Sequence, residues 1–194
     1  MNQFYIARHG ETENNRARRL SGWADTPLTD NGLEPTKSVI EKIRDIHIDD
    51  MYSSDLGRAF KTTEEIAKGI GFTKQIIQLF GLREVSYGDA ANMKSDEAYK
   101  LYPGLDSDTH FIPPNGESLE HMQNRVFATI NELNSNHSNA NILLVSHSGV
   151  MAAINSKYIG QDFGAHNISE AYPHDYVGRF TIEENKIASF EEVV

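Results

Sequence analysis

Two histidines each follow directly on a short apolar run. FYIA (4–7) precedes Arg8 and His9, and NILLVS (141–146) precedes His147. A neutral imidazole nitrogen can accept a phosphoryl group, and a covalent intermediate divides one difficult step into two easier ones. A guanidinium fork matches phosphate oxygens in two parallel hydrogen bonds. The three side chains therefore suit the handling of a phosphoryl group. The simpler alternative is that Arg8 and His9 are surface residues at a strand exit.

The histidines lack the neighbours that a zinc site requires. The sequence contains no H-x-x-x-H pair and no cysteine, so the ligand spacings typical of zinc are missing. Without cysteine there is also no disulfide and no cysteine nucleophile. We therefore expect no metal and no cofactor, and full activity in EDTA would eliminate a metal hydrolase.

Composition and charge limit the class of partner. The chain has 194 residues and a formal net charge of −10, from 18 basic and 28 acidic residues. Nucleic-acid binders usually carry a basic excess, so we expect no nucleic-acid partner. No apolar run in the sequence reaches the ~18–20 residues of a membrane helix, and no secretory signal is recognisable. We expect one cytoplasmic domain spanning 1–194, either monomer or homodimer, without membrane contact.

Strand-like and helix-like segments alternate along the chain. Strands are predicted at 3–8, 48–54, 74–79 and 141–147, helices at 31–46, 55–71, 95–102, 116–137 and 148–160, and a C-terminal hairpin at 176–193 turning at Glu184-Asn185. This alternation predicts an α/β domain with a mainly parallel sheet. Ligands of such sheets bind beyond the carboxyl ends of the strands, where both histidines should then meet.

The motifs around these residues resemble the histidine phosphatase superfamily, which includes the cofactor-dependent phosphoglycerate mutases and many small phosphatases. The resemblance begins at ARHGETENN (7–15) and continues in order through SGWADTPLTDNG (21–32), YSSDLGRAFKTTEEIA (52–67), LREVSYG (82–88), PNGES (114–118) and VSHSG (145–149). It implies a three-layer αβα sandwich with helices on both faces of the sheet, and a variable lid or specificity region at about 85–116.

The resemblance also implies the catalytic roles. His9 would be the nucleophile that becomes phosphohistidine, and Arg8, Arg58 and His147 would hold the phosphoryl oxygens. Glu84 would protonate the leaving oxygen and then activate water. The plain alternatives are an exposed helix arginine paired with Asp55 for Arg58, and a surface glutamate beside Arg83 for Glu84. The protonation state of His147 stays open.

Four further residues align with positions near the substrate in the family. They are Asn15, Ser21, Gly22 and Ser148, the last of which stands where the family usually has glycine. For Asn15, Ser21 and Gly22 the alternative is a role in a turn or loop. For Ser148, the backbone N–H at a predicted helix start could face the phosphate, and the added hydroxyl could tighten the pocket or bind substrate. An arginine cluster is expected at the pocket rim, formed by Arg16, Arg18 and Arg19.

Several other residues are expected to have structural roles. Trp23 is interpreted as a packing residue, and Glu117 and Ser118 as the opening of the long helix, where an acid favours the positive end. Gly10 is expected to let the backbone turn sharply after His9. Solvated or structural roles are expected for five further histidines that match no motif, namely His110, His121, His137, His166 and His174.

The sequence favours hydrolysis over mutase activity. No arginine lies between Arg83 and Arg125, where the mutases place cations that grip a second acidic group. With fewer cations, water should be the acceptor of the phosphoryl group. The expected function is therefore a phosphomonoester hydrolase acting on a small phosphorylated metabolite. The alternatives are a cofactor-dependent phosphoglycerate mutase and a catalytically weak phosphate-binding or regulatory module.

Overall fold

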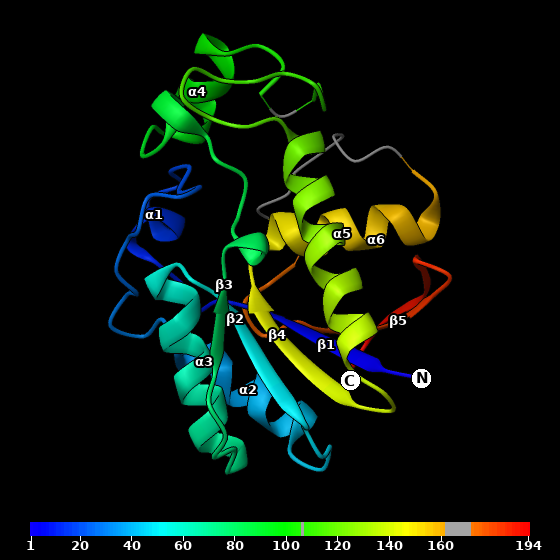
Figure 1. Cartoon of the computed structure of the whole chain (residues 1–194). Coiled ribbons are helices and arrows are strands. Elements are labelled where there is room, and N and C mark those ends of the chain that lie inside the picture. Colours follow the sequence, from blue (N-terminus) through cyan, green and yellow to red (C-terminus); the bar gives the residue numbers. More distant parts are fainter. Residues whose placement is uncertain (106, 162–171) are drawn as a thin grey trace.

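The computed structural model describes residues 1–105, 107–161 and 172–194. These residues form a sheet of six strands in the order β3-β2-β4-β1-β5-β6 (Figure 1). The strands are β1 (Gln3–Arg8), β2 (Asp50–Ser54), β3 (Ile77–Leu79), β4 (Asn141–Ser146), β5 (Val177–Glu183) and β6 (Lys186–Glu192). The first four are mutually parallel, whereas β5 runs antiparallel to β1 and β6 antiparallel to β5. The predicted α/β fold with a mainly parallel sheet is confirmed.

Helices cover both faces of this sheet. The helices α2 (Glu34–Ile43) and α3 (Gly57–Ile70) lie on one face, and α5 (Leu119–Asn136) and α6 (Ser148–Ile159) lie on the other (Figure 1). Consecutive residues of a strand alternate between the two cores: Phe4 and Ile6 pack toward α5 and α6, and Tyr5 and Ala7 toward α2 and α3. A strand covered on both faces is apolar throughout, which explains the uninterrupted FYIA run.

The register of the sheet brings the two histidine segments together. β1 pairs with β4 so that Arg8 lies opposite Ser146, and the His9 N–H continues the ladder by donating to the Ser146 carbonyl at 2.9 Å. His9 and His147 therefore leave the sheet at the same edge, as the sequence predicts.

Two short helices stand beyond that edge. Residues 13–16 form α1 (Glu13–Arg16), capped by Thr12, where the sequence suggested only a turn. The helix α4 (Ser95–Leu101) lies within 85–116, the range predicted to be a lid or specificity region, and the residues before it contact the loop after α1. The Leu20 N–H donates to the Met93 carbonyl at 3.0 Å, and the Asn92 N–H donates to the Leu20 carbonyl at 2.7 Å.

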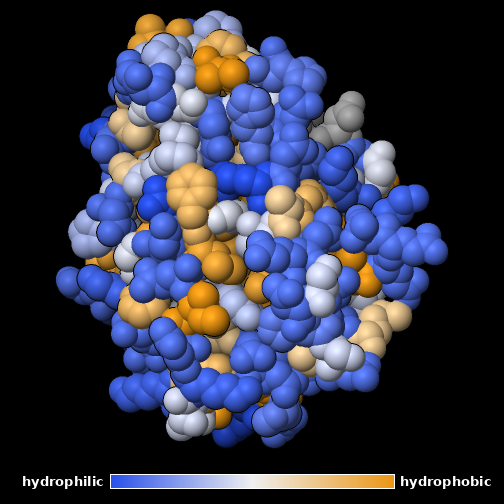
Figure 2. Space-filling view, viewed as in Figure 1, coloured by the Kyte–Doolittle hydropathy of each residue, from blue (hydrophilic) through white to orange (hydrophobic). Residues whose placement is uncertain are grey.

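Some predicted boundaries were too wide. The helix expected over 31–46 spans only Glu34–Ile43, with Pro35 in its first turn, and the strand expected over 74–79 is reduced to Ile77–Leu79. This edge strand is partly uncovered: Ile77 and Phe80 are about half exposed, and Figure 2 shows apolar side chains gathered over this region. Among the described helices, none is both long and apolar enough to cross a membrane.

Candidate active site

The five residues expected to be catalytic converge at the carboxyl edge of the sheet. Arg8 ends β1 and His9 follows it, Arg58 is the second residue of α3, and His147 is the N-cap of α6. Glu84 comes from the loop that follows β3 and a short 3₁₀ turn. All five side chains are buried, although each is polar or charged, so each needs partners inside the protein.

His9 has an unprotonated ring nitrogen that faces Arg58 at the pocket. Its Nδ1 lies 2.7 Å from the Gly10 carbonyl, which can only accept, so Nδ1 carries the proton and Nε2 is unprotonated. Burial first, and then the positive charges of Arg58 and of other neighbouring groups, lower the pKa of His9 well below its usual range. The ring is therefore neutral at pH 7, which is the state of an imidazole nucleophile.

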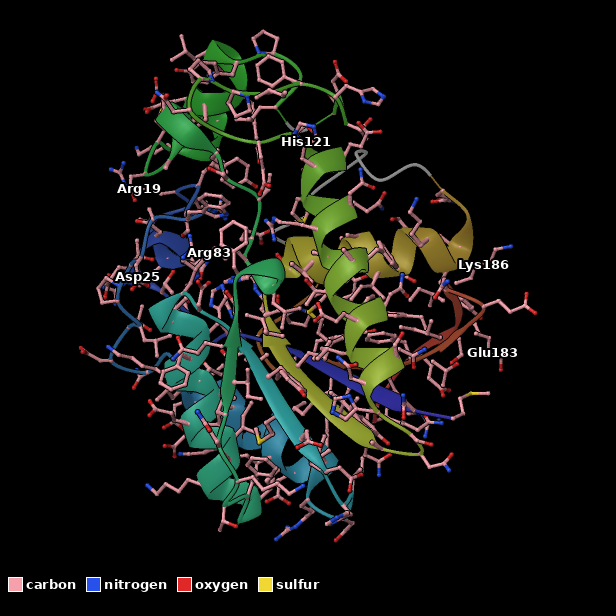
Figure 3. The ribbon with its side chains drawn as sticks, in the orientation of Figure 1. Arg19, Asp25, Arg83, His121, Glu183 and Lys186 are labelled. Carbon is pink, nitrogen blue, oxygen red and sulfur yellow. The ribbon has the colours of Figure 1, made fainter. Side chains whose placement is uncertain are left out.

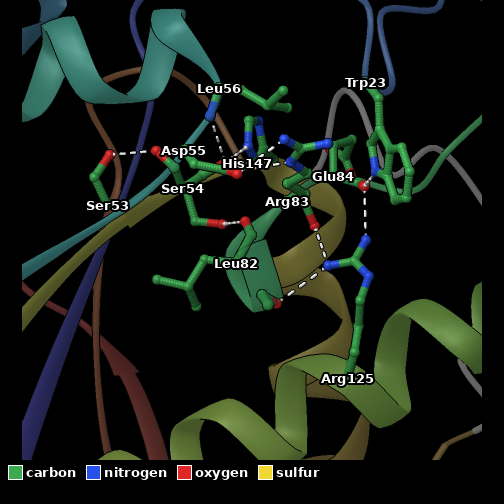
Figure 4. Close-up of polar contacts among 12 residues, drawn as sticks. Trp23, Ser53, Ser54, Asp55, Leu56, Leu82, Arg83, Glu84, Arg125 and His147 are labelled. Carbon is green, nitrogen blue, oxygen red and sulfur yellow. Dashed lines mark hydrogen bonds and ion pairs between the residues drawn. The ribbon is translucent and has the colours of Figure 1, made fainter. Parts of the chain in front are cut away.

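His147 is fixed in the opposite tautomer. Arg58 Nη2 lies 3.3 Å from His147 Nδ1, and since a guanidinium only donates, Nδ1 accepts. The proton is then on Nε2, which lies 2.8 Å from Ser54 Oγ (Figure 4). Burial first, and then Arg58, lowers the pKa of His147 well below its usual range. The sequence left the protonation state of His147 open, and the structure favours the neutral ring.

Arg58 lies between the two imidazoles. Its Nε donates to His9 Nε2 at 3.3 Å, and its two Nη atoms donate to the carbonyls of Ala24 and Gly22 at 2.9 and 2.7 Å. Burial lowers the pKa of Arg58 to about 10, so the guanidinium stays charged at pH 7. The alternative of an exposed arginine paired with Asp55 is wrong.

Asp55 is instead the partner of Arg83. The Arg83 Nε and Nη2 donate to the two carboxylate oxygens of Asp55 at 2.6 and 2.8 Å. The guanidinium of Arg83 also lies over the rings of Trp23 and Phe80, at 5.1 and 4.9 Å from their centroids. In Figure 3, Arg83 lies on the same side of the molecule as Arg19 and Asp25.

The Glu84 carboxylate is anchored by backbone N–H groups. Oε1 accepts from the Val85 N–H at 3.0 Å, and Oε2 accepts from the Gly149 N–H at 3.1 Å, in the first turn of α6. A carboxylate is favoured at the positive end of a helix. Only 8% of Glu84 is exposed, so the alternative of a surface glutamate is wrong.

The residues just before β5 make two contacts with Arg8 and His9, although no sequence motif marks these residues. The Arg8 Nη1 donates to the Tyr172 carbonyl at 2.7 Å, and His174 Nδ1 lies 2.5 Å from the His9 carbonyl. The rings of His174 and His9 are 5.6 Å apart, and burial lowers the pKa of His174 to about 4. The structural role expected for His174 is therefore contact with His9. His166 lies outside the described residues.

A small pocket of about 50 Å³ opens at this cluster. The four residues expected near the substrate all line it, together with the rim arginine Arg19 and four of the five residues expected to be catalytic; the lining residues are Arg8, His9, Asn15, Arg19, Leu20, Ser21, Gly22, Arg58, Glu84, Tyr87 and Ser148. His147 is not among them and lies next to His9, with 5.0 Å between the two ring centroids. The Ser21 hydroxyl is buried and has no hydrogen-bond partner among the described residues, so it is available to a ligand. Arg16 and Arg18 are not among the lining residues, and Arg16 pairs with Glu13 at 2.5 Å.

Two of the expected structural roles take a different physical form. Gly10 does not have a positive φ; a Cβ there would lie 2.3 Å from the Gly32 carbonyl oxygen, so close packing of two loops requires the glycine. Asn15 has both of its proposed roles, since it lines the pocket while its Oδ1 accepts from the Thr12 N–H at 3.1 Å in a capping box.

Over the described ranges, no three His, Asp or Glu side chains cluster as a metal ion would require.

The fold and this cluster define an α/β protein with two buried histidines and two buried arginines grouped beside a small pocket at the edge of its sheet. The chain belongs to the histidine phosphatase superfamily (branch 1), whose family model matches residues 4–186. The members include both phosphatases and mutases, and the relatives of this chain carry names of both kinds.

Two curated relatives illustrate this range. The chain is 33% identical over 165 residues to the probable phosphoglycerate mutase GpmB of Proteus mirabilis, covering 82% of this chain and 76% of that protein. It is 30% identical over 157 residues to the uncharacterized phosphatase PhoE of Bacillus subtilis, covering 81% and 77%.

Solved structures show the same fold. Bacillus stearothermophilus YhfR has a TM-score of 0.83 at 24% identity, with 96% of this chain and 94% of that chain covered. The α-ribazole phosphatase of Shigella flexneri has a TM-score of 0.81 at 24% identity, with 98% and 95% covered.

Proposed function

We propose that this protein is a phosphomonoester hydrolase that forms a phosphohistidine at His9 and acts on a small phosphorylated metabolite. The observation that carries the proposal is the state of His9: a buried, neutral imidazole whose unprotonated Nε2 faces the Arg58 guanidinium inside a pocket. A lone pair with a cation beside it suits attack on a phosphorus atom whose oxygens carry negative charge.

In the first step, His9 Nε2 forms a bond to phosphorus while the bond from phosphorus to the ester oxygen breaks. Arg8 and Arg58 donate to the phosphoryl oxygens, and Glu84 in its protonated form gives its proton to the departing oxygen. A bound phosphoryl dianion also favours protonation of His147. The Nδ1–H of the protonated His147 can then donate to the phosphoryl group, while its Nε2–H continues to donate to Ser54 Oγ.

In the second step, a water molecule replaces the alcohol. The Glu84 carboxylate takes a proton from the water, the water oxygen bonds to phosphorus, and the bond from phosphorus to Nε2 breaks with its electron pair returning to His9. Inorganic phosphate leaves, and Glu84 is again protonated for the next cycle. The substrate ester and this water molecule, together with the side chains named, balance both steps.

The cations of the pocket support hydrolysis over mutase chemistry. Arg8, Arg19 and Arg58 are its lining cations, and Arg19 already donates to the Asn92 carbonyl at 2.7 Å. Lys94 and Lys100, the only lysines between 84 and 124, are exposed and do not line the pocket. A mutase must retain an intermediate with two acidic groups and exclude water, which this pocket is poorly equipped to do.

The test is a phosphate-release screen over metabolite phosphomonoesters, with His9→Ala as the blank. We expect turnover with the parent protein, none with His9→Ala, and an acid-labile phosphoprotein after quenching. Absence of turnover across pH 5–8 would overturn the proposal in favour of a phosphate-binding module.

Mutase activity is the second candidate, because several relatives are named as probable mutases. Incubation with 2,3-bisphosphoglycerate separates the two candidates. Faster interconversion of phosphoglycerates than release of phosphate would identify a mutase.

A further inference from the structure

The loop that carries Glu84 is held by side chains from other parts of the fold. Four consecutive carbonyls, Gly81 to Glu84, each accept a hydrogen bond from a side chain outside the segment. Ser146 Oγ donates to Leu82 at 2.7 Å, and Arg125 donates to the other three. A segment without a regular ladder must find such partners when it is buried, and here one arginine supplies most of them.

Arg125 uses all five of its N–H donors, three on these carbonyls and two on the Glu117 carboxylate. Figure 4 shows Arg125 reaching the carbonyls of this loop. Its Nη1 donates to the carbonyls of Gly81 and Arg83 at 3.1 and 2.7 Å, and its Nη2 to the Glu84 carbonyl at 2.7 Å. The remaining donors bind the Glu117 carboxylate, at 2.6 Å from Nη2 and 3.1 Å from Nε.

Glu117 and Trp23 complete the support. Glu117 Oε1 also accepts from the Ser86 N–H at 3.0 Å, so the Arg125–Glu117 pair grips the loop on both sides of Glu84. The Trp23 Nε1 donates to the same Glu84 carbonyl at 2.7 Å. Arg125 and Glu117 are both largely buried, at 15% and 14% side-chain exposure, so their geometry is fixed by packing rather than by solvent-exposed contacts.

We propose that Arg125 is a positioning residue for Glu84: it sets the backbone from which this carboxyl group meets the leaving oxygen and later the attacking water. The inference rests on the proposed hydrolase function. Arg125 does not line the pocket, so it acts through Glu84 and not on the substrate. A general acid must lie within hydrogen-bond reach of its target, and a displacement of about 1 Å costs roughly 10²-fold in rate.

Lysine cannot replace this arginine. An ammonium group has three donors on a flexible stem, whereas the planar guanidinium presents five in a fixed fork. In Arg125→Lys, at least two of the accepting groups lose their donor, and the loop is free to shift. The matched control is Arg179→Lys, because Arg179 is half-exposed, pairs with Glu191 and the Tyr5 side chain within the described part of the chain, and does not line the pocket.

The assay compares kcat/KM for two esters that differ in their need for a general acid. p-Nitrophenolate leaves without protonation, whereas an alkyl alkoxide such as that of glycerol phosphate requires it. Because kcat/KM reports steps up to release of the alcohol, we expect Arg125→Lys to lose about 10²-fold with the alkyl ester and less than about threefold with the aryl ester. The kcat for both esters should fall, with phosphohistidine accumulating, since Glu84 also activates water.

Trp23→Phe provides a milder version of the same test. It keeps an aromatic ring and removes one donor to the Glu84 carbonyl, so a selective loss of roughly three- to tenfold with the alkyl ester is expected. This variant decides the question by the same ratio if Arg125→Lys fails to fold.

The outcomes separate this inference from the function on which it rests. A parent protein without turnover on either ester refutes the hydrolase itself. If the parent protein turns over both esters, the positioning role of Arg125 is refuted by either of two results. One is an equal loss of kcat/KM for the two esters, and the other is no loss of kcat/KM in the folded variants.

Discussion

The buried histidines should make the stability of this protein unusually dependent on pH. Folding lowers the pKa of His9 and His147 well below 6.5, and that of His174 to about 4, in each case chiefly through burial. In the unfolded chain the same rings take up a proton near pH 6.5. Below that pH the unfolded state therefore binds more protons than the native state, and the native state loses stability as the pH falls.

The size of this effect follows from the linkage relation. Each ring that stays neutral in the native state costs about 1.4 kcal/mol for each pH unit below its unfolded pKa. Between pH 7.5 and 5.5 the three rings together should lower the free energy of unfolding by about 4 kcal/mol. For His174 the loss ends near its native pKa of about 4.

The measurement is urea unfolding of the parent protein and of His9→Asn at pH 7.5, 6.5 and 5.5. His9→Asn should flatten the pH dependence of the free energy of unfolding by about 1 kcal/mol over this interval, whatever it does to stability at pH 7.5. His121→Asn is the control, because His121 is exposed at the start of α5 and meets water in both states (Figure 3). Equal pH dependence in His9→Asn and the parent would refute the buried, neutral state of His9.

Three further substitutions test the packing of the pocket. Gly10→Ala places a Cβ 2.3 Å from the Gly32 carbonyl oxygen, so it should cost about 1–3 kcal/mol of unfolding free energy; an unchanged urea midpoint would contradict the close approach. Arg58→Lys loses the fork that bridges both imidazoles, and kcat/KM should fall about 10²–10³-fold; a fall below tenfold in a folded variant would show that the fork is dispensable. Ser54→Ala removes the acceptor of His147 Nε2–H, so it should lower the free energy of unfolding by about 1–3 kcal/mol. If the ¹⁵N spectra of His147 are identical in the parent and in Ser54→Ala, this hydrogen bond is excluded.

Local patterns determined most of the architecture. Apolar runs of strand length identify β1 and β4 as strands buried on both faces, and Leu119, Met122 and Val126 mark the buried side of α5 by their spacing. These signals are readable because they depend on neighbours within a few residues. The strand β3 was less well defined, since its short sequence is exposed at the sheet edge and its ends are set by pairing with β2.

The chain order of the motifs was enough to nominate the residues of the site. Arg8, His9, Arg58, Glu84 and His147 come from four separate segments, and parallel pairing of β1 with β4 explains why two of those segments end side by side. What could not be predicted was the partner of each polar group. Asp55 binds Arg83 and not Arg58, although it lies closer in the sequence to Arg58.

The sequence by itself therefore determined the family and the α/β fold, and it nominated most of the residues that line the pocket, though not Leu20 or Tyr87. Only the tertiary structure decided their chemical states: the tautomers of His9 and His147, the approach of His174, and the support of Glu84 by Arg125. The physical reason is that these states are set by hydrogen bonds to backbone carbonyls and hydroxyls from distant segments. Every residue has a backbone carbonyl, so no residue type predicts such a contact. The contact exists only once the chain is folded.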